Sequence, residues 1–162
     1  QIGVPMRLLK MGVPILVLVM MIVAIAAPIG PLPGFFIRGT LTEAPERWPD
    51  TSLEDEIRLQ VVDGLPRVVI IWMVEHNEDL YIVGSSNSGW VQMIGESAPV
   101  KMRLEDSTFK LVAERVTENL EAISFAYRDK YRAEYPDIIA SFPPITEAGD
   151  SFHIFRLKRP SS

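Results

Sequence analysis

The stretch VVIIWMVEHNEDLYIVG, residues 68–84, decides the fold of this 162-residue chain. It is apolar on both faces from Val68 to Val74, and a second apolar run follows after a short polar turn. A strand that is covered on both faces appears in the sequence as a continuous apolar run. A short polar connection between two such runs is typical of a hairpin. The stretch therefore predicts two central, antiparallel strands.

Further strands are predicted on both sides of this hairpin. Residues 57–63, IRLQVVD, alternate between apolar and polar side chains, and Gln60 is expected on a solvated face. Three more segments are predicted strands: VKMRLED (100–106), TFKLVAERV (108–116) and FHIFRLK (152–158). The side chains expected to point inward from the two alternating strands are Ile57, Leu59, Val61, Val100, Met102 and Leu104.

The apolar period changes to that of a helix in residues 117–135. Apolar side chains recur there three and four positions apart, at Leu120, Ile123, Tyr127 and Tyr131. Thr117 is expected to cap this helix and Pro136 to end it. About six strands with one main helix indicate an α+β fold, in the form of a small barrel.

The first forty residues predict a single transmembrane helix. Residues 11–37 carry no charged side chain, and about 20 apolar residues suffice to cross a bilayer as a helix. We expect the helix from about Met6 to Ala27, ended by the prolines that follow it. The alternative is a cleaved signal peptide, with Arg7 and Lys10 as its basic end and residues 24–26 as its cleavage site. We expect the uncleaved signal anchor.

The charges beside this helix predict its orientation. Basic residues that flank a membrane helix stay in the cytoplasm, so Arg7 and Lys10 predict a cytoplasmic N-terminus. The folded domain is then expected on the outer side, which is the periplasm in a bacterial cell. One stripe of the helix carries flexible or small side chains, which suit a partner helix and equally a surface facing lipid. The stripe consists of Val17, Met20, Met21 and Ala24.

Composition limits the classes of function. We expect residues 1–37 to form the tail, membrane helix and proline-rich collar, residues 38–55 a connector, and residues 56–162 the soluble domain. The chain has a formal net charge of −5, with its acidic residues outside the apolar N-terminal part, which argues against nucleic acid as a partner. Cysteine is absent, and the two histidines, His76 and His153, stand far apart, so no metal site is predicted.

Residues 56–135 resemble the flavin-binding split β-barrel superfamily. A hairpin ends in a Leu-Tyr strand, a Ser/Gly loop and a Trp follow (LYIVGSSNSGW), and then come PVKMR and AERV on the next two strands. The superfamily includes pyridoxamine-phosphate-oxidase-like proteins and deazaflavin-dependent nitroreductases. The resemblance implies a split barrel that commonly dimerises and builds its cofactor site between subunits. By position it implies cofactor-phosphate contacts from Ser85, Ser86, Ser88, Gly89 and Trp90.

The Ser/Gly loop, residues 85–89, has a second interpretation. Relatives often carry Arg or Lys in or near the loop, because a phosphate favours a countercharge, whereas this loop has none. Arg67, Lys101 and Arg103 lie on other strands and are the candidates to reach it. The loop also reads as the start of a short capped helix that needs no ligand, which we favour. That helix would have Ser88 as N-cap, Trp90 packed inward and Gly95 as its end.

Three functions remain open at this point. We favour a membrane-anchored, non-catalytic accessory subunit of a larger integral membrane complex, of respiratory or photosynthetic type, without a cofactor. Its partners would be the other subunits and the lipid bilayer. The alternative is a membrane-tethered oxidoreductase that uses FMN or a deazaflavin. A tethered ligand-binding or scaffold module is the third.

Overall fold

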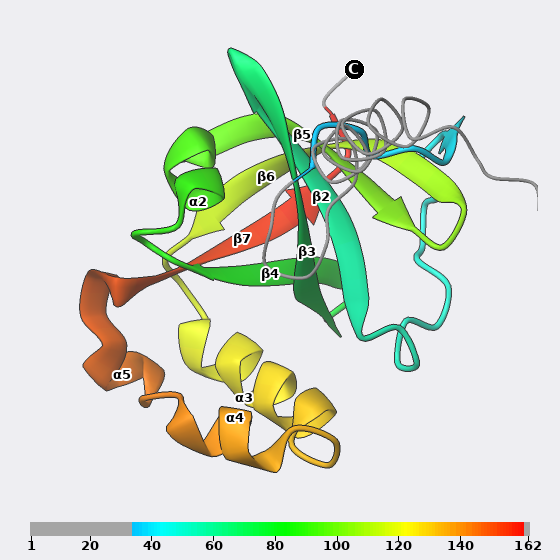
Figure 1. The fold of residues 1–162 in the computed structure, drawn as a ribbon. Helices are drawn as coiled ribbons and strands as arrows, with labels where there is room; N and C mark the ends of the chain where they lie inside the picture. The colour runs from blue at the N-terminus through cyan, green and yellow to red at the C-terminus, as the bar shows by residue number, and fades with distance from the viewer. Residues whose placement is uncertain (1–33, 161–162) are drawn as a thin grey trace, which may run out of the picture.

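The structure, a computed structural model, describes residues 34–160 (Figure 1). Its elements in chain order are β1 (Thr40–Thr42), β2 (Glu56–Asp63), β3 (Leu65–His76), β4 (Asp79–Ser85), α2 (Gly89–Ile94), β5 (Ser97–Leu104), β6 (Ser107–Val116), α3 (Leu120–Tyr131), α4 (Pro136–Ser141), α5 (Ile145–Ala148), the 3-10 helix η1 (Gly149–Ser151) and β7 (Phe152–Lys158). The expected membrane helix, Met6 to Ala27, lies outside the described residues. Among residues 34–160, no helix has both the length and the apolar character that crossing a membrane requires.

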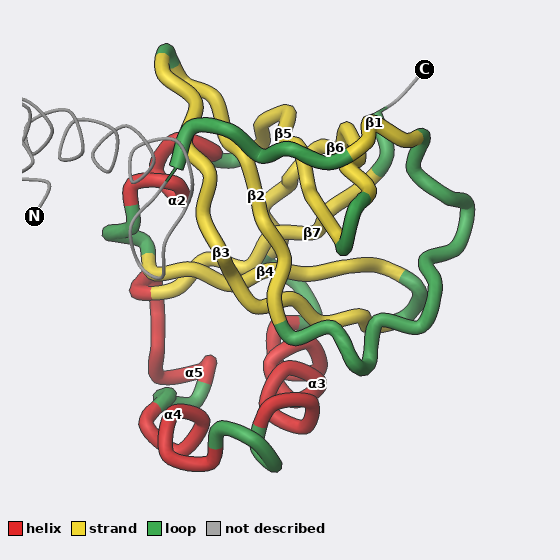
Figure 2. The backbone as a smooth tube through the Cα atoms, turned by 45° about the vertical axis from the view of Figure 1, so that its right-hand side comes forward, coloured by secondary structure: helices red, strands yellow, loops and turns green. Residues whose placement is uncertain are grey.

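Six strands form a closed barrel in the order β6-β5-β2-β3-β4-β7, with β7 pairing back to β6. Every pairing within this ring is antiparallel, whereas the short β1 lies outside it, parallel to β6. The central hairpin is confirmed as β3 and β4. Figure 2 shows the ring of strands with α3, α4 and α5 gathered at one end. The predicted α+β barrel of six strands is therefore confirmed.

The barrel interior is filled by alternate side chains of its strands. All six residues that the alternation predicts to point inward are buried, and none exposes more than 7% of its surface. They pack in one cluster with side chains from the other strands, including Met73, Leu80, Ile82, Phe155 and Leu157. Burial of each large apolar side chain contributes about 1.5–3 kcal/mol, so this cluster is the main source of stability of the barrel.

Ion pairs reinforce the closure of the ring between β6 and β7. Glu114 of β6 accepts hydrogen bonds from Lys158 Nζ (2.6 Å) and from Arg156 Nη2 (3.2 Å), both on β7. These hydrogen bonds lower the pKa of the Glu114 carboxyl below its ordinary value. Because all three side chains are partly exposed, their contribution to stability is small beside that of the core.

The prediction that Gln60 lies on a solvated face is wrong. The side chain is buried, and its Nε2 donates a hydrogen bond of 3.0 Å to the carbonyl of Phe35. The chain before β1 covers this face, because Gly34 and Val68 exchange two backbone hydrogen bonds, of 2.9 and 2.7 Å. An alternating pattern marks a polar face, but it does not reveal a segment from elsewhere in the chain that covers it.

Helices α3, α4 and α5 pack against the barrel through a second cluster of buried side chains. Trp72 of β3 stacks on Tyr131, with ring centroids 4.4 Å apart, and Tyr127 and Tyr135 lie against the same indole. These three tyrosines therefore form the seam between the helices and the barrel. The sequence analysis predicts only one main helix in this region, and the structure adds the short α4 and α5.

Both predicted ends of the main helix are wrong. The N-cap is Asn119, not Thr117, and it adopts a left-handed conformation (φ +55°) that asparagine tolerates better than most residues. Pro136 does not end α3, which stops at Tyr131, but starts α4. Proline is favoured at a first helical position because the missing N–H has no partner there.

Tyr131 and Lys130 form hydrogen bonds with the main chain of β3 at the point where the neighbouring strand β2 no longer pairs with it. β2 begins at Glu56, opposite Trp72, so the next residue, Met73, has no partner on that side. The Tyr131 hydroxyl accepts a hydrogen bond from the Met73 N–H (3.0 Å) and lies 2.6 Å from the Met73 carbonyl oxygen. Lys130 Nζ donates to the carbonyls of Thr51, Glu54 and Met73, at 2.7–3.0 Å. Burial lowers the pKa of Lys130 from its ordinary value.

We predict that Tyr131→Phe lowers the free energy of unfolding by about 1–3 kcal/mol, because it leaves the buried Met73 N–H without its hydrogen-bond acceptor. Tyr127→Phe is the matched control, since the Tyr127 hydroxyl forms no hydrogen bond with a described residue. Denaturant titration of the full chain measures both. Equal values for the two variants would show that the hydroxyl of Tyr131 contributes nothing.

Candidate functional site

The Ser/Gly loop joins the end of β4 to the start of α2. Within it, the Ser88 N–H donates to the Ser85 carbonyl (2.8 Å), which makes a tight turn. The Ser86 N–H donates to the carbonyl of Ser151 (2.9 Å), so the loop is tied to η1. The Ser85 Oγ accepts one further bond, from the Asn87 N–H (3.4 Å), so the loop is fixed without the hydroxyls of Ser86 and Ser88.

The predicted short helix exists with the predicted boundaries, but the predicted capping hydrogen bond from the Ser88 side chain does not form. Helix α2 begins after Ser88 and ends at Gly95, which has φ +60°. Trp90 is buried, with its ring 6.0 Å from that of Phe155, as expected for a core residue. The Ser88 side chain, however, makes no capping hydrogen bond.

The indole of Trp90 is therefore placed in the core and not toward a ligand. Gly84 permits this packing, because a Cβ at that position would overlap the Trp90 ring. Of the five residues that the resemblance assigns to a cofactor, Trp90 can offer only its main chain. The hydroxyls of Ser86 and Ser88 form no hydrogen bond with any residue from 34 to 160 and are free to meet a ligand.

Arg67 of β3 supplies the positive charge that the loop itself lacks. Its guanidinium lies directly beside Gly89, where a Cβ would overlap Nη1. Arg67 forms no ion pair within the described part of the chain, and residues 1–33 contain no carboxylate side chain. A partly buried guanidinium beside Gly89, without a carboxylate partner among the described residues, is a suitable place for an anion.

The other two basic candidates do not join this group. Arg103 donates to the carbonyl of Glu105 (2.7 Å) and pairs with Asp106 (3.2 Å). Lys101 is exposed on β5. The sequence names Arg67 as a candidate, but it holds no signal that separates Arg67 from Arg103, because the reach of a side chain depends on how the strands pair.

The two histidines and Trp48, the other residues considered for a site, make contacts that belong to the fold. His76 contacts Asn77 beside the β3–β4 turn (3.1 Å), and His153 lies edge-on to Phe155, with centroids 6.2 Å apart. No group of three metal-binding side chains occurs among residues 34–160. Trp48 packs edge-on against Phe109 (5.2 Å), as expected for an interior residue. The stripe Val17, Met20, Met21 and Ala24 lies outside the described residues.

No family model matches the chain, and no curated protein matches it either. Several solved structures are similar to it. The conserved hypothetical protein Rv2991 from Mycobacterium tuberculosis is 16% identical, with a TM-score of 0.54 over 68% of this chain and 76% of that chain. HutZ, the heme storage protein from Vibrio cholerae, is 18% identical, with a TM-score of 0.49 over 70% of this chain and 87% of its own. The FAD and heme binding protein from Mycobacterium smegmatis is 16% identical, with a TM-score of 0.47 over 65% of this chain and 61% of that chain. The likeness to Rv2991 supports the fold and says nothing of activity.

Ser88 in the loop and Gly84 just before it are expected to respond differently to alanine. Ser88→Ala is predicted to change the free energy of unfolding by less than the roughly 1 kcal/mol of a lost helix cap, because no cap bond exists. Gly84→Ala is predicted to cost about 1–3 kcal/mol, because the new Cβ displaces the buried Trp90. Denaturant titration followed by tryptophan fluorescence distinguishes them. A larger loss for Ser88→Ala than for Gly84→Ala would contradict this description of the loop.

Proposed function

We propose that the barrel binds a phosphate-bearing flavin or deazaflavin at the Ser/Gly loop, with Arg67 as the countercharge. The observation that carries the proposal is the position of the Arg67 guanidinium beside Gly89. The absence of a basic residue from the loop was the main argument for a site without function. That argument loses its force when a neighbouring strand provides the charge.

The residues present fit a phosphate group. Arg67 neutralises its charge, and the hydroxyls of Ser86 and Ser88 donate hydrogen bonds to its oxygens. Gly89 makes room for the guanidinium, because a Cβ there would overlap Nη1. When bound, such a cofactor supplies hydride chemistry that no side chain provides. The protein binds and orients it. The resemblance to dimeric split barrels implies that a second copy of the chain contributes the contacts to the ring system.

The test is a titration of the full chain with FMN, followed by quenching of flavin fluorescence. Arg67→Gln is predicted to weaken binding by about tenfold or more, because a charge-assisted hydrogen bond is lost. Lys110→Gln removes the same charge from an exposed position on β6 and is the matched control. Inorganic phosphate should compete with FMN in the wild-type chain. Equal FMN affinity in Arg67→Gln and the wild type would refute the proposal.

A second proposal concerns the membrane, and the exposed apolar side chains at one end of the barrel favour it. The described chain begins at Gly34, which pairs with Val68 of β3. The nearby tip of the β2–β3 hairpin, which extends beyond the ring in Figure 2, exposes 56% of Val62 and 73% of Leu65. Phe36, two residues from Gly34, is 62% exposed. This apolar end adjoins the segment that the sequence predicts as an anchor, so we propose that it faces a bilayer or an integral membrane partner.

In this proposal the chain is a single-pass membrane protein with its N-terminus in the cytoplasm and the barrel on the outer, periplasmic side. It serves as an accessory subunit of a larger membrane complex, of respiratory or photosynthetic type. The stripe Val17, Met20, Met21 and Ala24 contacts a partner helix, because close fit rather than hydrophobicity drives association within lipid. Cofactor binding and membership of a complex are compatible, and each has its own test.

Replacing the residues from Met6 to Ala27 by leucine, with Arg7 and Lys10 kept so that the orientation is unchanged, tests the accessory role. The barrel should stay with the membrane fraction, because the replacement still spans a bilayer. It should no longer copurify with partner subunits, because the small and flexible side chains of the stripe are gone. Copurification at the wild-type level would mean that the segment acts only as a tether.

A further inference from the structure

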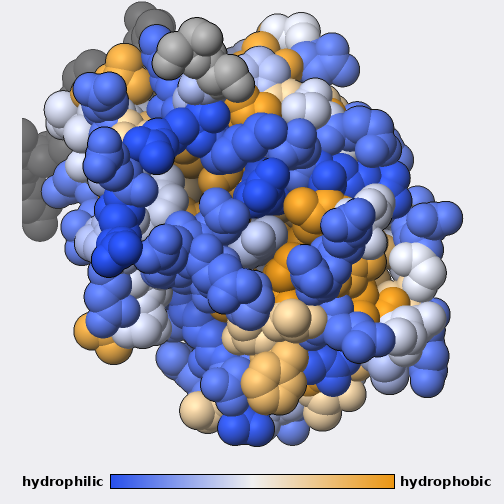
Figure 3. Space-filling view, turned by 180° about the vertical axis from the view of Figure 1, so that it is seen from behind, coloured by the Kyte–Doolittle hydropathy of each residue, from blue (hydrophilic) through white to orange (hydrophobic). Residues whose placement is uncertain are grey.

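A cavity of about 130 Å³ lies between the barrel and the C-terminal helices. Its walls come from β4 and β7 on one side and from α3, α5 and the segment before α5 on the other. From behind, the molecule shows a band of hydrophobic side chains in this region (Figure 3). Apolar side chains dominate the lining, among them Val83, Tyr127, Phe142, Ile145, Phe152 and Ile154.

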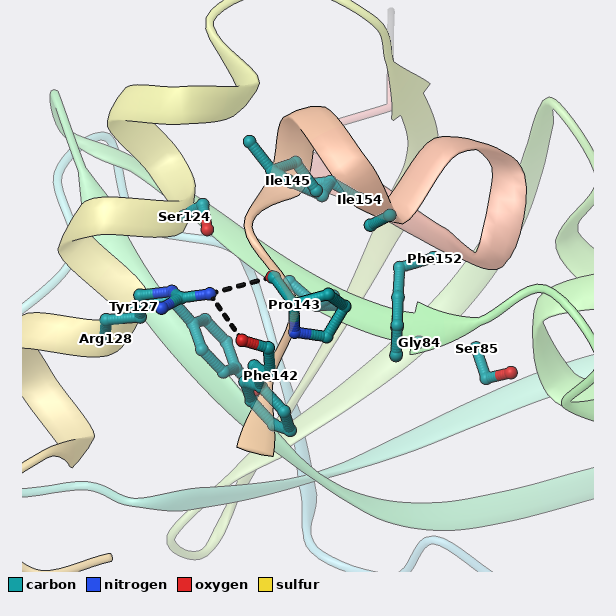
Figure 4. Close-up of a pocket in the computed structure, with 12 residues that line it drawn as sticks. Gly84, Ser85, Ser124, Tyr127, Arg128, Phe142, Pro143, Ile145, Phe152 and Ile154 are labelled. Carbon is teal, nitrogen blue, oxygen red and sulfur yellow. Dashed lines mark hydrogen bonds between the residues drawn. The ribbon is translucent and has the colours of Figure 1, made fainter. Parts of the chain in front are cut away.

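One edge of the cavity is polar, and it is formed by Arg128 and Ser124 of α3 (Figure 4). These residues are four positions apart and so lie on the same face of the helix. Arg128 Nη2 donates to the carbonyls of Phe142 (2.9 Å) and Pro143 (2.8 Å). These two bonds use only part of the guanidinium, which carries five N–H donors.

Within the described residues, the rest of the guanidinium has no hydrogen-bond partner. Its Nε and Nη1 groups, like the Ser124 hydroxyl, have no acceptor among residues 34–160, and Arg128 forms no ion pair with them. The carbonyl bonds hold the charged group at the cavity edge. A fixed cation beside an apolar cavity complements a small molecule that has an apolar body and one negative charge.

The size of the cavity limits that molecule. An apolar cavity of roughly 150 Å³ holds a single benzene ring, so about 130 Å³ leaves space for one ring or a short branched chain. We propose that the cavity binds a monocyclic aromatic carboxylate, with its ring among the apolar side chains and its carboxylate on Arg128 and Ser124. This site is separate from the group formed by Arg67 and Gly89, although Ser85 of the Ser/Gly loop also lines the cavity.

The test uses benzoate as the probe and the isoleucine methyl NMR signals of the full chain as the readout. Benzoate should shift the signals of Ile145 and Ile154, which line the cavity, in a saturable way. Arg128→Gln should lower the affinity for benzoate by about tenfold or more. It should leave the uncharged analogue benzamide nearly unaffected. Arg132→Gln, at the C-cap of α3 and with an exposed side chain, is the matched control and should change the affinity for neither ligand.

Arg128→Gln also removes the bonds to residues 142 and 143, so a second variant covers the case in which the cavity itself collapses. Arg128→Lys keeps a charged donor. Compared with Arg128→Gln, it should raise the affinity for benzoate more than the affinity for benzamide. The proposal is overturned if benzoate does not shift the two isoleucines, or if Arg128→Gln leaves its affinity unchanged. It is also overturned if both variants lower the affinities for benzoate and benzamide equally, because Arg128 then only holds residues 142 and 143 against α3.

Discussion

The rest of the structure depends on β7, which pairs with β4 on one side and with β6 on the other. Helices α3, α4 and α5 lie in the chain between β6 and β7, which are antiparallel neighbours, so they gather at the end of the barrel where β6 ends and β7 begins. The same closure brings η1, just before β7, against the Ser/Gly loop, just after β4, where Ser86 bonds to Ser151. The shape of the loop and the cavity beneath the helices both follow from the position of this last strand.

The candidate phosphate site combines two parts of the chain with different roles. Backbone bonds fix the Ser/Gly loop and leave two serine hydroxyls free, while β3 carries the charge of Arg67 to Gly89. In a protein with a net charge of −5, a partly buried guanidinium without a carboxylate partner in residues 34–160 needs a physical reason. A bound anion provides one, and the planar guanidinium of an arginine matches the oxygens of a phosphate.

The fold could be predicted from sequence where a short-range pattern exists. Alternation located the strands, because inward residues such as Leu59 and Met102 must meet the same core. Patterns failed where the outcome depends on distant segments: Gln60 is buried by residues before β1, and α4 and α5 are too short to show a period. For the site, the loop was identified from its residues and its resemblance. The choice of Arg67 over Arg103 required the strand pairing, which no local pattern contains.

The most direct test of the central claim is an experimental structure of the full chain with FMN. The account predicts that the phosphate lies between the Arg67 guanidinium and the hydroxyls of Ser86 and Ser88, close to Gly89, with Trp90 still in the core. A phosphate bound elsewhere on the barrel, or an Arg67 side chain that turns away to a carboxylate while the loop stays empty, would contradict it.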